Sequence, residues 1–460
     1  MHRNSMESRN VSRRGFVKGI GAATGAALAA GGNSRLAMAG TFSASLPDLQ
    51  AALNACTTDE DFWKTVRREF LLDPAIIYMN TGTEGAMAGL TVESLKSGYL
   101  AFAANPMGAC YYNPTYSYEQ KPNRTKVAAF LGADPEEVAF TMNTTHGLNL
   151  ILNALPFQSG DEIITTLHDH AALPSPLDCL RDRRGIVPVR IALPTLVQSR
   201  QEIVYRFASA LTPRTKALAF SHINYTNGLR MPVRELCDLA RAYGLISIVD
   251  GAHTPGMIEL NLHDIGCDFY CCSGHKWLNG PAGTGVLYIR NAPSNPWSVR
   301  PVMTELYDSL ATRPITDLFQ YSGQHNTPAY TAVAVAVDFV KTVGQAKIEQ
   351  RVKDLNSYFK KKVVEQWGDA ALLSTTLPEF ASGMGTFNPF LNHYDMMKII
   401  SFSTRVRTEY NIITRFVGWL EKPGGPTRYG QRVSTHLFNE EKDVDSFLDA
   451  AAKAVASIGR

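Results

Sequence analysis

Between about residues 80 and 300, short apolar runs rich in β-branched and aromatic residues alternate with stretches of helical periodicity. The strand-like runs are "EVAFTM", "DEIITT", "IVPVRIAL", "TKALAFSHI", "ISIVD", "DFYCCS" and "GVLYIR". Helices are expected between them from Gly147, near Ala172 and from Val233. This alternation predicts an α/β domain whose mainly parallel sheet is covered by helices on both faces. Ligands bind such sheets at the carboxyl ends of the strands, so residues that close a strand are the candidates for function.

The pattern changes beyond about residue 310. A long helix is expected from Thr331, a charged helix from Glu349, then shorter strands and a last helix from Asp443. We therefore predict a large domain over residues 80–305 and a smaller α+β domain over residues 306–460, with residues 40–79 packing on the smaller one.

The first 39 residues have a different composition. "SRRGFVK", from Ser12 to Lys18, precedes the apolar run "GIGAATGAALAAGG" and the small-residue site "LAMAG". This order predicts a twin-arginine export signal over residues 1–39 that is cut after Ala39, and hence a periplasmic protein that meets the twin-arginine export machinery. The run is too short and too rich in glycine for a membrane span of roughly 20 residues, so no stable membrane association is expected. The alternative interpretation is a basic tail with an Ala-rich helix.

The charge balance and the cysteine pattern argue against several kinds of partner and site. There are 45 basic and 42 acidic residues, a formal net charge of +3, which gives no reason to expect a nucleic-acid partner. Seven cysteines at irregular spacing make no disulfide framework, and the lack of a CxxC pair argues against structural zinc. Cys271 and Cys272 follow apolar residues and are expected to be buried.

Three segments bring polar residues to the ends of predicted strands. In "LISIVDGAHTPG" the strand ends at Asp250, which either caps the strand or aims a charge at a ligand. In "AFTMNTTHGLNLILNAL", Thr144 and Thr145 stand before a helix, where free N–H groups bind anions or a threonine simply caps the helix. In "SGHKW", Lys276 lies between a histidine and a tryptophan at the end of an apolar run.

Together these residues suit one cofactor. Pyridoxal phosphate has a phosphate, a ring nitrogen that needs a proton and an aldehyde, which call for an anion cradle, a carboxylate and a lysine. Lys276 would form a Schiff base with the aldehyde, and its amine is nucleophilic only when burial and nearby cations keep it neutral. Asp250 would keep the ring nitrogen protonated.

"VDGAHTPG" followed by "SGHKW", with "NTTHGLN" upstream and "RVSTHLFNEEKDVDSFL" near the end, resembles the class V aminotransferases. Within that family the sequence is most similar to the isopenicillin N epimerase-like group, whose relatives include cysteine desulfurases. The resemblance covers roughly Asn80 to Leu448. It implies the pyridoxal-phosphate transferase fold of type I, an enzyme and a homodimer.

The resemblance also assigns roles near the cofactor ring. Lys276 matches the Schiff-base lysine, and Asp250 matches the partner of the pyridine nitrogen. His253 matches a position near the ring hydroxyl, and His170 matches the histidine that stacks on the ring face. A metal pair formed by His168 and His170 is the competing interpretation of "LHDHAAL".

Further positions match those around the phosphate and the substrate. The phosphate positions are Thr144, Thr145, Ser273 and His275. Arg432 matches the arginine that grips the substrate carboxylate, with a surface arginine as the alternative. Asn224, in "SHINYTNG", falls near a contact to the cofactor or substrate.

Two departures from the family pattern carry information. Where relatives have a threonine that reaches the phosphate of a neighbouring subunit, this chain has Gln324, with Thr327 as a possible substitute. Past Cys272 there is no cysteine at all, so a desulfurase that forms a persulfide on a cysteine of the C-terminal domain is not expected.

The leading hypothesis is a periplasmic enzyme that carries out aminotransfer, or a related carbanion reaction, on a small-molecule amino acid or a peptide-like substrate. Exported members of the family are associated with tailoring of peptide siderophores such as pyoverdine, which is an analogy. Epimerisation and β-elimination are the rivals. Two further hypotheses have less support. One is a scaffold protein without cofactor, and the other is a nucleotide-binding enzyme in which "GPAGTG" is the phosphate loop, although this segment lacks the G-x-G-x-x-G spacing.

The residues that line the substrate entrance are harder to assign. Arg415 and Trp419 are candidates to face the ligand. Tyr111, Tyr112 and Tyr116 either line the entrance or pack between domains.

Overall fold

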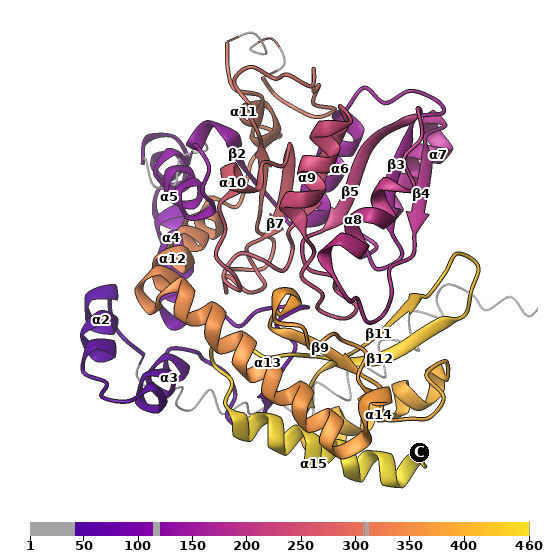
Figure 1. Cartoon of the computed structure of the whole chain (residues 1–460). Helices are drawn as coiled ribbons and strands as arrows, with labels where there is room; N and C mark the ends of the chain where they lie inside the picture. Colours follow the sequence, from indigo (N-terminus) through magenta and orange to yellow (C-terminus); the bar gives the residue numbers. More distant parts are fainter. Residues whose placement is uncertain (1–41, 114–119, 307, 309–311, 460) are drawn as a thin grey trace, which may run out of the picture. The chain divides into compact units, whose positions relative to one another are not determined.

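The computed structural model describes residues 42–113, 120–306, 308 and 312–459. Its largest element is a seven-stranded sheet of order β2-β8-β7-β6-β5-β3-β4 (Figure 1). The strands are β2 (Val138–Thr141), β3 (Glu162–Thr166), β4 (Val187–Ile191), β5 (Thr215–Ser221), β6 (Ile246–Asp250), β7 (Phe269–Ser273) and β8 (Gly285–Ile289). The neighbours from β4 to β7 pair in parallel, whereas β8 runs antiparallel to both β7 and β2. The predicted α/β fold with a mainly parallel sheet is confirmed.

The sheet is buried on both faces, which explains why its strands are continuously apolar in sequence. Successive residues belong to different apolar clusters: on β6, Ile248 packs on one face and Val249 on the other. On β7, Cys271 and Cys272 likewise point to opposite faces and are 0% and 2% exposed. The expectation that these two cysteines are buried is confirmed.

Helices cover both faces of this sheet. One cluster is completed by α6 (Thr144–Ala154), α7 (Pro174–Arg184) and α11 (Ile315–Gln320). The other is completed by α5 (Lys121–Leu131), α8 (Arg200–Ala208), α9 (Val233–Ala242), α10 (Leu262–Ile265) and α12 (Thr327–Val343), and α4 (Gly89–Ala104) packs beside α12. Short 3₁₀ or π-helical turns lie at Gly108–Tyr112, Pro135–Glu137, Asp369–Ala371 and Pro378–Phe380.

Two helices begin earlier than their periodicity predicts, because asparagine caps precede them. The Asn143 side chain accepts a hydrogen bond from the His146 N–H, so α6 starts at Thr144 rather than at Gly147. The Asn326 side chain caps α12 in the same way, and that helix starts at Thr327 rather than Thr331. Asparagine is among the strongest N-cap residues.

The C-terminal part is built around a three-stranded antiparallel sheet of order β11-β12-β9. Its strands are β9 (Met384–Phe387), β11 (Arg415–Leu420) and β12 (Thr427–Ser434), and its helices are α13 (Gln345–Trp367), α14 (Met396–Tyr410) and α15 (Glu441–Ile458). A separate apolar cluster, which includes Phe359, Phe387, Phe402 and Phe447, lies between these elements. This part of the chain is therefore of α+β type.

The segment before residue 80 contacts this C-terminal part. It contains α2 (Leu46–Asn54), α3 (Asp59–Arg68) and β1 (Ile77–Tyr78), and β1 pairs in parallel with β10 (Ile412–Ile413). The Arg67 guanidinium lies 2.7 Å from the Asp443 carboxylate. The boundary between residues 305 and 306 stays a prediction. The export signal over residues 1–39 lies outside the described residues.

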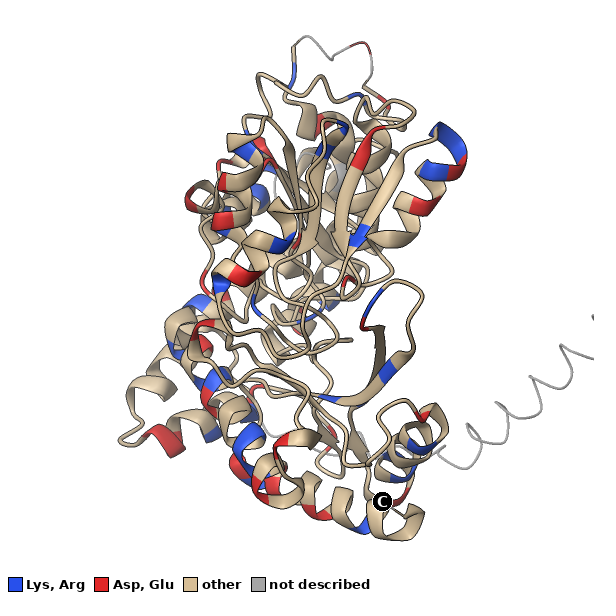
Figure 2. Cartoon of the chain, turned by 45° about the vertical axis from the view of Figure 1, so that its right-hand side comes forward, with Lys and Arg blue, Asp and Glu red and all other residues tan. Residues whose placement is uncertain are grey.

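Basic and acidic residues are interspersed along the ribbon (Figure 2). Many form pairs within one helix, such as Arg405 with Glu409 on α14. Among the described residues, no helix is long and apolar enough to cross a membrane.

Candidate active site

A cavity of about 250 Å³ lies at the carboxyl ends of the parallel strands. It is lined by Gly82, Thr83, Asn143, Thr144, Thr145, His170, Ala172, Tyr225, Asp250, Ala252, His253, Ser273, His275, Lys276, Arg415 and Arg432. The residues to which the sequence gave a role around the cofactor ring, its phosphate cradle or the substrate carboxylate within this chain are all among them except Asn224. Segments separated by up to 350 residues in the chain thus meet where the strand order predicts a ligand site.

Lys276 follows the end of β7 in a tightly held loop. The Gly85 N–H donates to the His275 carbonyl at 2.7 Å, and the Trp277 indole donates to His253 Nδ1 at 3.3 Å. Burial lowers the pKa of Lys276 to about 8, although the Asp250 carboxylate acts to raise it. The amine is therefore neutral, and able to attack an aldehyde, at a far lower pH than an ordinary lysine.

This pKa predicts how fast protein stripped of its cofactor takes up pyridoxal phosphate at different pH. The rate should rise as the Lys276 amine loses its proton and should level off above about pH 8. Stopped-flow absorption of the added cofactor, measured from pH 6 to pH 10, tests this. A rate that keeps rising to pH 10 would mean that the lysine has an ordinary pKa.

Gly85 keeps the lysine loop in place because nothing larger fits there. A Cβ atom at this position would lie 1.9 Å from the carbonyl oxygen of Lys276. We expect Gly85→Ala to displace that loop, to destabilise the protein by about 1–3 kcal/mol as overpacking does, and to reduce its cofactor content. Thermal unfolding and the absorption of bound cofactor measure the two effects.

The matched control is Gly425→Ala, whose new methyl group would mainly meet the flexible Lys422 side chain. Equal losses of thermal stability and of bound cofactor in the two variants would contradict the proposed role of Gly85.

Asp250 closes β6 and is 3% exposed. One of its carboxylate oxygens accepts the Ala252 N–H at 2.9 Å. Burial raises the pKa of Asp250 to about 6, and the negative charge of Asp169 adds to the rise while Lys276 opposes it. A buried carboxylate without a full set of donors is stabilised by a cationic partner, which a protonated ring nitrogen provides.

Asp169 is a positioning residue that the sequence analysis missed. Its carboxylate accepts from the hydroxyls of Thr165 and Thr166, from the N–H of Thr166, and from both the N–H and the hydroxyl of Ser221, at 2.7–2.8 Å. These bonds join the ends of β3 and β5 and fix the backbone next to His170. The signal available in the sequence was an acidic residue between two histidines just after a strand.

The anion cradle lies at the start of α6. Asn143, not a threonine, is the cap, so the plain Thr-cap interpretation does not hold and both Thr144 and Thr145 line the cavity. The Thr144 and Ser273 hydroxyls lie 2.7 Å apart, and His275 Nδ1 lies 3.2 Å from the Thr284 carbonyl. Hydroxyls and unsatisfied N–H groups at a helix N-terminus form an anion site.

The two histidines of "LHDHAAL" face different surroundings. His170 lines the cavity, edge-on to Tyr225 with ring centroids 5.0 Å apart, whereas His168 is buried, with its Nδ1 2.7 Å from the Thr226 hydroxyl. Burial lowers the pKa of each to about 4, so both rings are neutral. His168 is thus enclosed in the interior, whereas His170 faces the cavity.

His253 also lines the cavity. Burial, with Lys276 next in effect, lowers its pKa well below the ordinary value.

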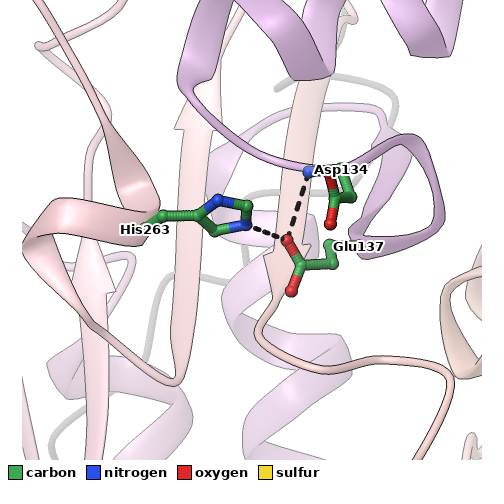
Figure 3. A group of neighbouring side chains, drawn as sticks. All are labelled: Asp134, Glu137 and His263. Carbon is green, nitrogen blue, oxygen red and sulfur yellow. Dashed lines mark hydrogen bonds and ion pairs between the residues drawn. The ribbon is translucent and has the colours of Figure 1, made fainter.

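Within the described part of the chain, one group has the spacing of metal ligands: Asp134, Glu137 and His263 (Figure 3). It lies away from the cavity lining. Glu137 is already engaged: one carboxylate oxygen lies 2.6 Å from His263 Nε2 and accepts the Asp134 N–H, and the other accepts the Asn291 N–H. The group ties α10 and the end of β8 to the start of β2.

Arg432 is 2% exposed on β12. Its guanidinium donates to the Tyr225 carbonyl at 3.0 Å, the Thr83 hydroxyl at 3.0 Å and the Asn80 side-chain oxygen at 3.3 Å, while its Nε is buried and has no partner among the described residues. Burial, with Arg415 next in effect, lowers its pKa to about 9. A buried guanidinium that meets only neutral oxygens suits an incoming carboxylate, so the surface-arginine alternative does not hold.

Asn224 and Trp419 lie behind the cavity wall. The Asn224 amide is fully buried and neither polar atom has a partner among the described residues, while its neighbour Tyr225 lines the cavity. Trp419 is buried against His168, whereas Arg415 lines the cavity. A role for Asn224 in binding stays a prediction.

Neither Gln324 nor Thr327 lines the cavity of this chain, and the Thr327 hydroxyl is buried without a partner among the described residues. Tyr111 and Tyr112 are exposed. Tyr116 lies outside the described residues.

The donor set fits pyridoxal phosphate. The N-terminus of α6 with Thr144 and Ser273 would hold the phosphate, Asp250 the ring nitrogen, and Lys276 the aldehyde, with His170 available to stack on the ring. Each of these groups either lacks a full set of partners or is a buried charge of unusual pKa, as expected of a site shaped for a ligand.

Comparison with known proteins agrees with this fit. The sequence profile of the class V aminotransferases matches residues 91–447. The chain is 28% identical over 404 residues to isopenicillin N epimerase of Streptomyces clavuligerus, covering 84% of this chain and 97% of that protein. It is 28% identical over 337 residues to cysteine desulfurase of Yersinia pseudotuberculosis, covering 71% and 80%.

Solved structures show the same fold. The apo structure of cysteine desulfurase from Thermococcus onnurineus superposes with a TM-score of 0.73 at 24% identity, covering 88% of this chain and 99% of that one. A C-DES variant with glycine covalently linked to the PLP cofactor gives a TM-score of 0.72 at 20% identity, covering 84% and 98%. The chain belongs to the class V aminotransferase family, is similar within it to the isopenicillin N epimerases, and uses pyridoxal phosphate as its cofactor.

Proposed function

We propose that this enzyme carries out aminotransfer on an amino acid or a peptide-like substrate. The observation that carries the proposal is the meeting, in one cavity, of a lysine of lowered pKa, a buried carboxylate and a buried arginine. Bound pyridoxal phosphate supplies an aldehyde that captures the substrate amine and a ring that accepts the electron pair of the α-carbon.

The protein residues then have separate tasks. Arg432 binds the substrate carboxylate and so fixes which bond of the α-carbon points at Lys276. The neutral Lys276 amine takes the proton from the substrate α-carbon and delivers it to the carbon that carried the cofactor aldehyde. Delivery to this other carbon distinguishes aminotransfer from epimerisation. Asp250 stays negatively charged beside the ring nitrogen throughout the reaction. His170 and Tyr225 line the cavity as neutral side chains and add no charge to it.

Epimerisation is the second candidate, favoured by the isopenicillin N epimerase of Streptomyces clavuligerus, whose similarity covers 97% of that protein. It begins with the same removal of the α-proton, but a proton must then return to the α-carbon on the face opposite to the one from which it left. β-Elimination is a further alternative.

A desulfurase that forms a protein persulfide is disfavoured. No cysteine whose side chain is described lines the cavity, and Cys237, Cys267, Cys271 and Cys272 are buried with raised pKa values. Such thiols are poor nucleophiles.

We also propose that the enzyme is exported by the twin-arginine route and acts in the periplasm, where tailoring of a peptide siderophore is a suitable role. The support is the pattern of residues 1–39 together with the family. A homodimer remains an expectation from the resemblance. Fractionation of cells that produce the full chain, with Arg13 and Arg14 replaced by lysine as the control, tests the export route.

The reaction type is tested by mixing cofactor-loaded protein with amino acids and short peptides in deuterium oxide. Conversion of the bound cofactor to its amine form, read by absorption, supports aminotransfer and identifies the amino donor. Inverted substrate with deuterium at the α-carbon, formed without that conversion, would instead establish epimerisation, and release of a 2-oxo acid with ammonia would establish elimination.

A further inference from the structure

The hairpin of β11 and β12 places two arginines side by side. Arg415 on β11 is directly opposite Arg432 on β12 in the antiparallel register, so both side chains leave the sheet on the same face. Val417 and Trp419, two and four residues further along β11, share that face and are 3% exposed each. Arg415 is exposed at this inward-facing position because the cavity opens there, and it lines the cavity.

The Arg415 guanidinium has no hydrogen bond and no ion pair with any described residue, whereas Arg432 is held by three neutral oxygens. The carboxylate that lines the cavity is Asp250, at the end of β6 and next to Lys276. Like charges opposite each other across a strand pair destabilise a sheet, and Arg415 lowers the pKa of Arg432. The hairpin therefore presents one more cation than an α-carboxylate requires.

The cofactor phosphate does not account for the second arginine. The donors for the phosphate lie at the start of α6 and at Ser273 and His275, on the seven-stranded sheet. Arg415 acts electrostatically on His170, Tyr225, Arg432 and Lys276, but is not among the charges that act on His275. It thus belongs to the substrate end of the cavity.

We infer that Arg415 recognises a second carboxylate, so that the substrate is an amino acid or peptide-like molecule with two acidic groups, one held by Arg432 and the other by Arg415. This inference rests on the proposed function for the role of Arg432, and it names the substrate class. Arg415 would then determine specificity without taking part in the chemistry.

Binding of unreactive acids tests this without any turnover. Calorimetric titration of the cofactor-loaded protein with glutarate, which has two carboxylates, is compared with butyrate, which has one. Glutarate should bind about 10- to 100-fold more tightly, the range expected for one further charge-assisted contact. Arg415→Gln should abolish that difference and leave butyrate binding within about twofold.

Lys422→Gln is the matched control, because it removes one positive charge from the turn of the same hairpin without touching the cavity lining. It should keep the preference for glutarate. If Arg415→Gln weakens both acids equally, the two arginines share a single carboxylate and the inference is wrong. It is also wrong if the unaltered protein does not prefer glutarate.

Turnover separates this inference from the proposed function. The ratio of kcat/KM for glutamate over glutamine, and for the same pair at the terminus of a short peptide, should exceed one and should fall towards one in Arg415→Gln. A clear preference for glutarate in binding, with no reaction of any amino acid, would overturn the proposed aminotransfer and leave the two-carboxylate site standing.

Discussion

Lys276→Ala is expected to lower turnover by at least about 10⁴-fold, the upper range for loss of a positioned proton carrier alone. The variant also loses the amine that bonds the cofactor aldehyde, so the visible absorption of lysine-bound cofactor should disappear even when excess pyridoxal phosphate is present. Steady-state rates and absorption spectra of the same preparation measure both losses. Folding should be retained, because removing a charge from this cavity relieves a desolvation penalty.

The chain offers a matched control for this experiment. Lys360 is also buried, burial also lowers its pKa to about 8, and its amine donates to the Thr375 carbonyl in the C-terminal part. Lys360→Met should change thermal stability without changing the absorption of bound cofactor. A Lys276→Ala protein that kept full activity would mean that the cavity is not the place of reaction.

Asp250→Asn is expected to lower kcat by about 10²- to 10³-fold, the effect of removing one preorganised electrostatic group. The amide oxygen can still accept the Ala252 N–H, so the local structure is kept while the negative charge is lost. Without that charge the ring nitrogen is not held protonated, and the electron pair of the α-carbon is less well stabilised. Single-turnover absorption kinetics with a reactive amino acid measure the chemical step.

Asp268→Asn is the control for the loss of a buried carboxylate. Asp268 is 5% exposed, accepts from the N–H and hydroxyl of Ser247 and pairs with Arg290, but does not line the cavity. We expect it to lower stability and leave the single-turnover rate of folded protein unchanged. Equal rate losses in the two variants would show that the effect of Asp250 is structural.

The sequence predicts the strands of the large sheet and most of the residues that line the cavity, because both depend on patterns within short segments of the chain. Apolar runs mark the buried strands; Asp250 is the last residue of β6, and Lys276 lies in the loop that follows β7. The antiparallel direction of β8 is not visible in its apolar pattern, since a strand buried on both faces looks alike in either direction.

Residues that act through distant contacts could not be predicted in this way. The need for glycine at position 85 arises from a backbone 191 positions away in the sequence, at Lys276. Tyr225 rather than Asn224 lines the cavity, because the chain enters a turn over residues 225–227 and the direction of each side chain there depends on how that turn is folded. The pairing of Arg415 with Arg432 depends on the register of a hairpin whose turn sets it.

The cavity is assembled from two sheets, and they contribute different groups. Lys276, Asp250 and the anion cradle belong to the seven-stranded sheet and the helix that follows its strand β2, whereas both arginines belong to the three-stranded sheet. Substitutions in the β11–β12 hairpin can therefore alter which acids bind, while Lys276, Asp250 and the anion cradle stay unchanged. New substrate preferences could arise on this scaffold through a handful of hairpin mutations, which makes residues 412–434 a compact target for directed evolution.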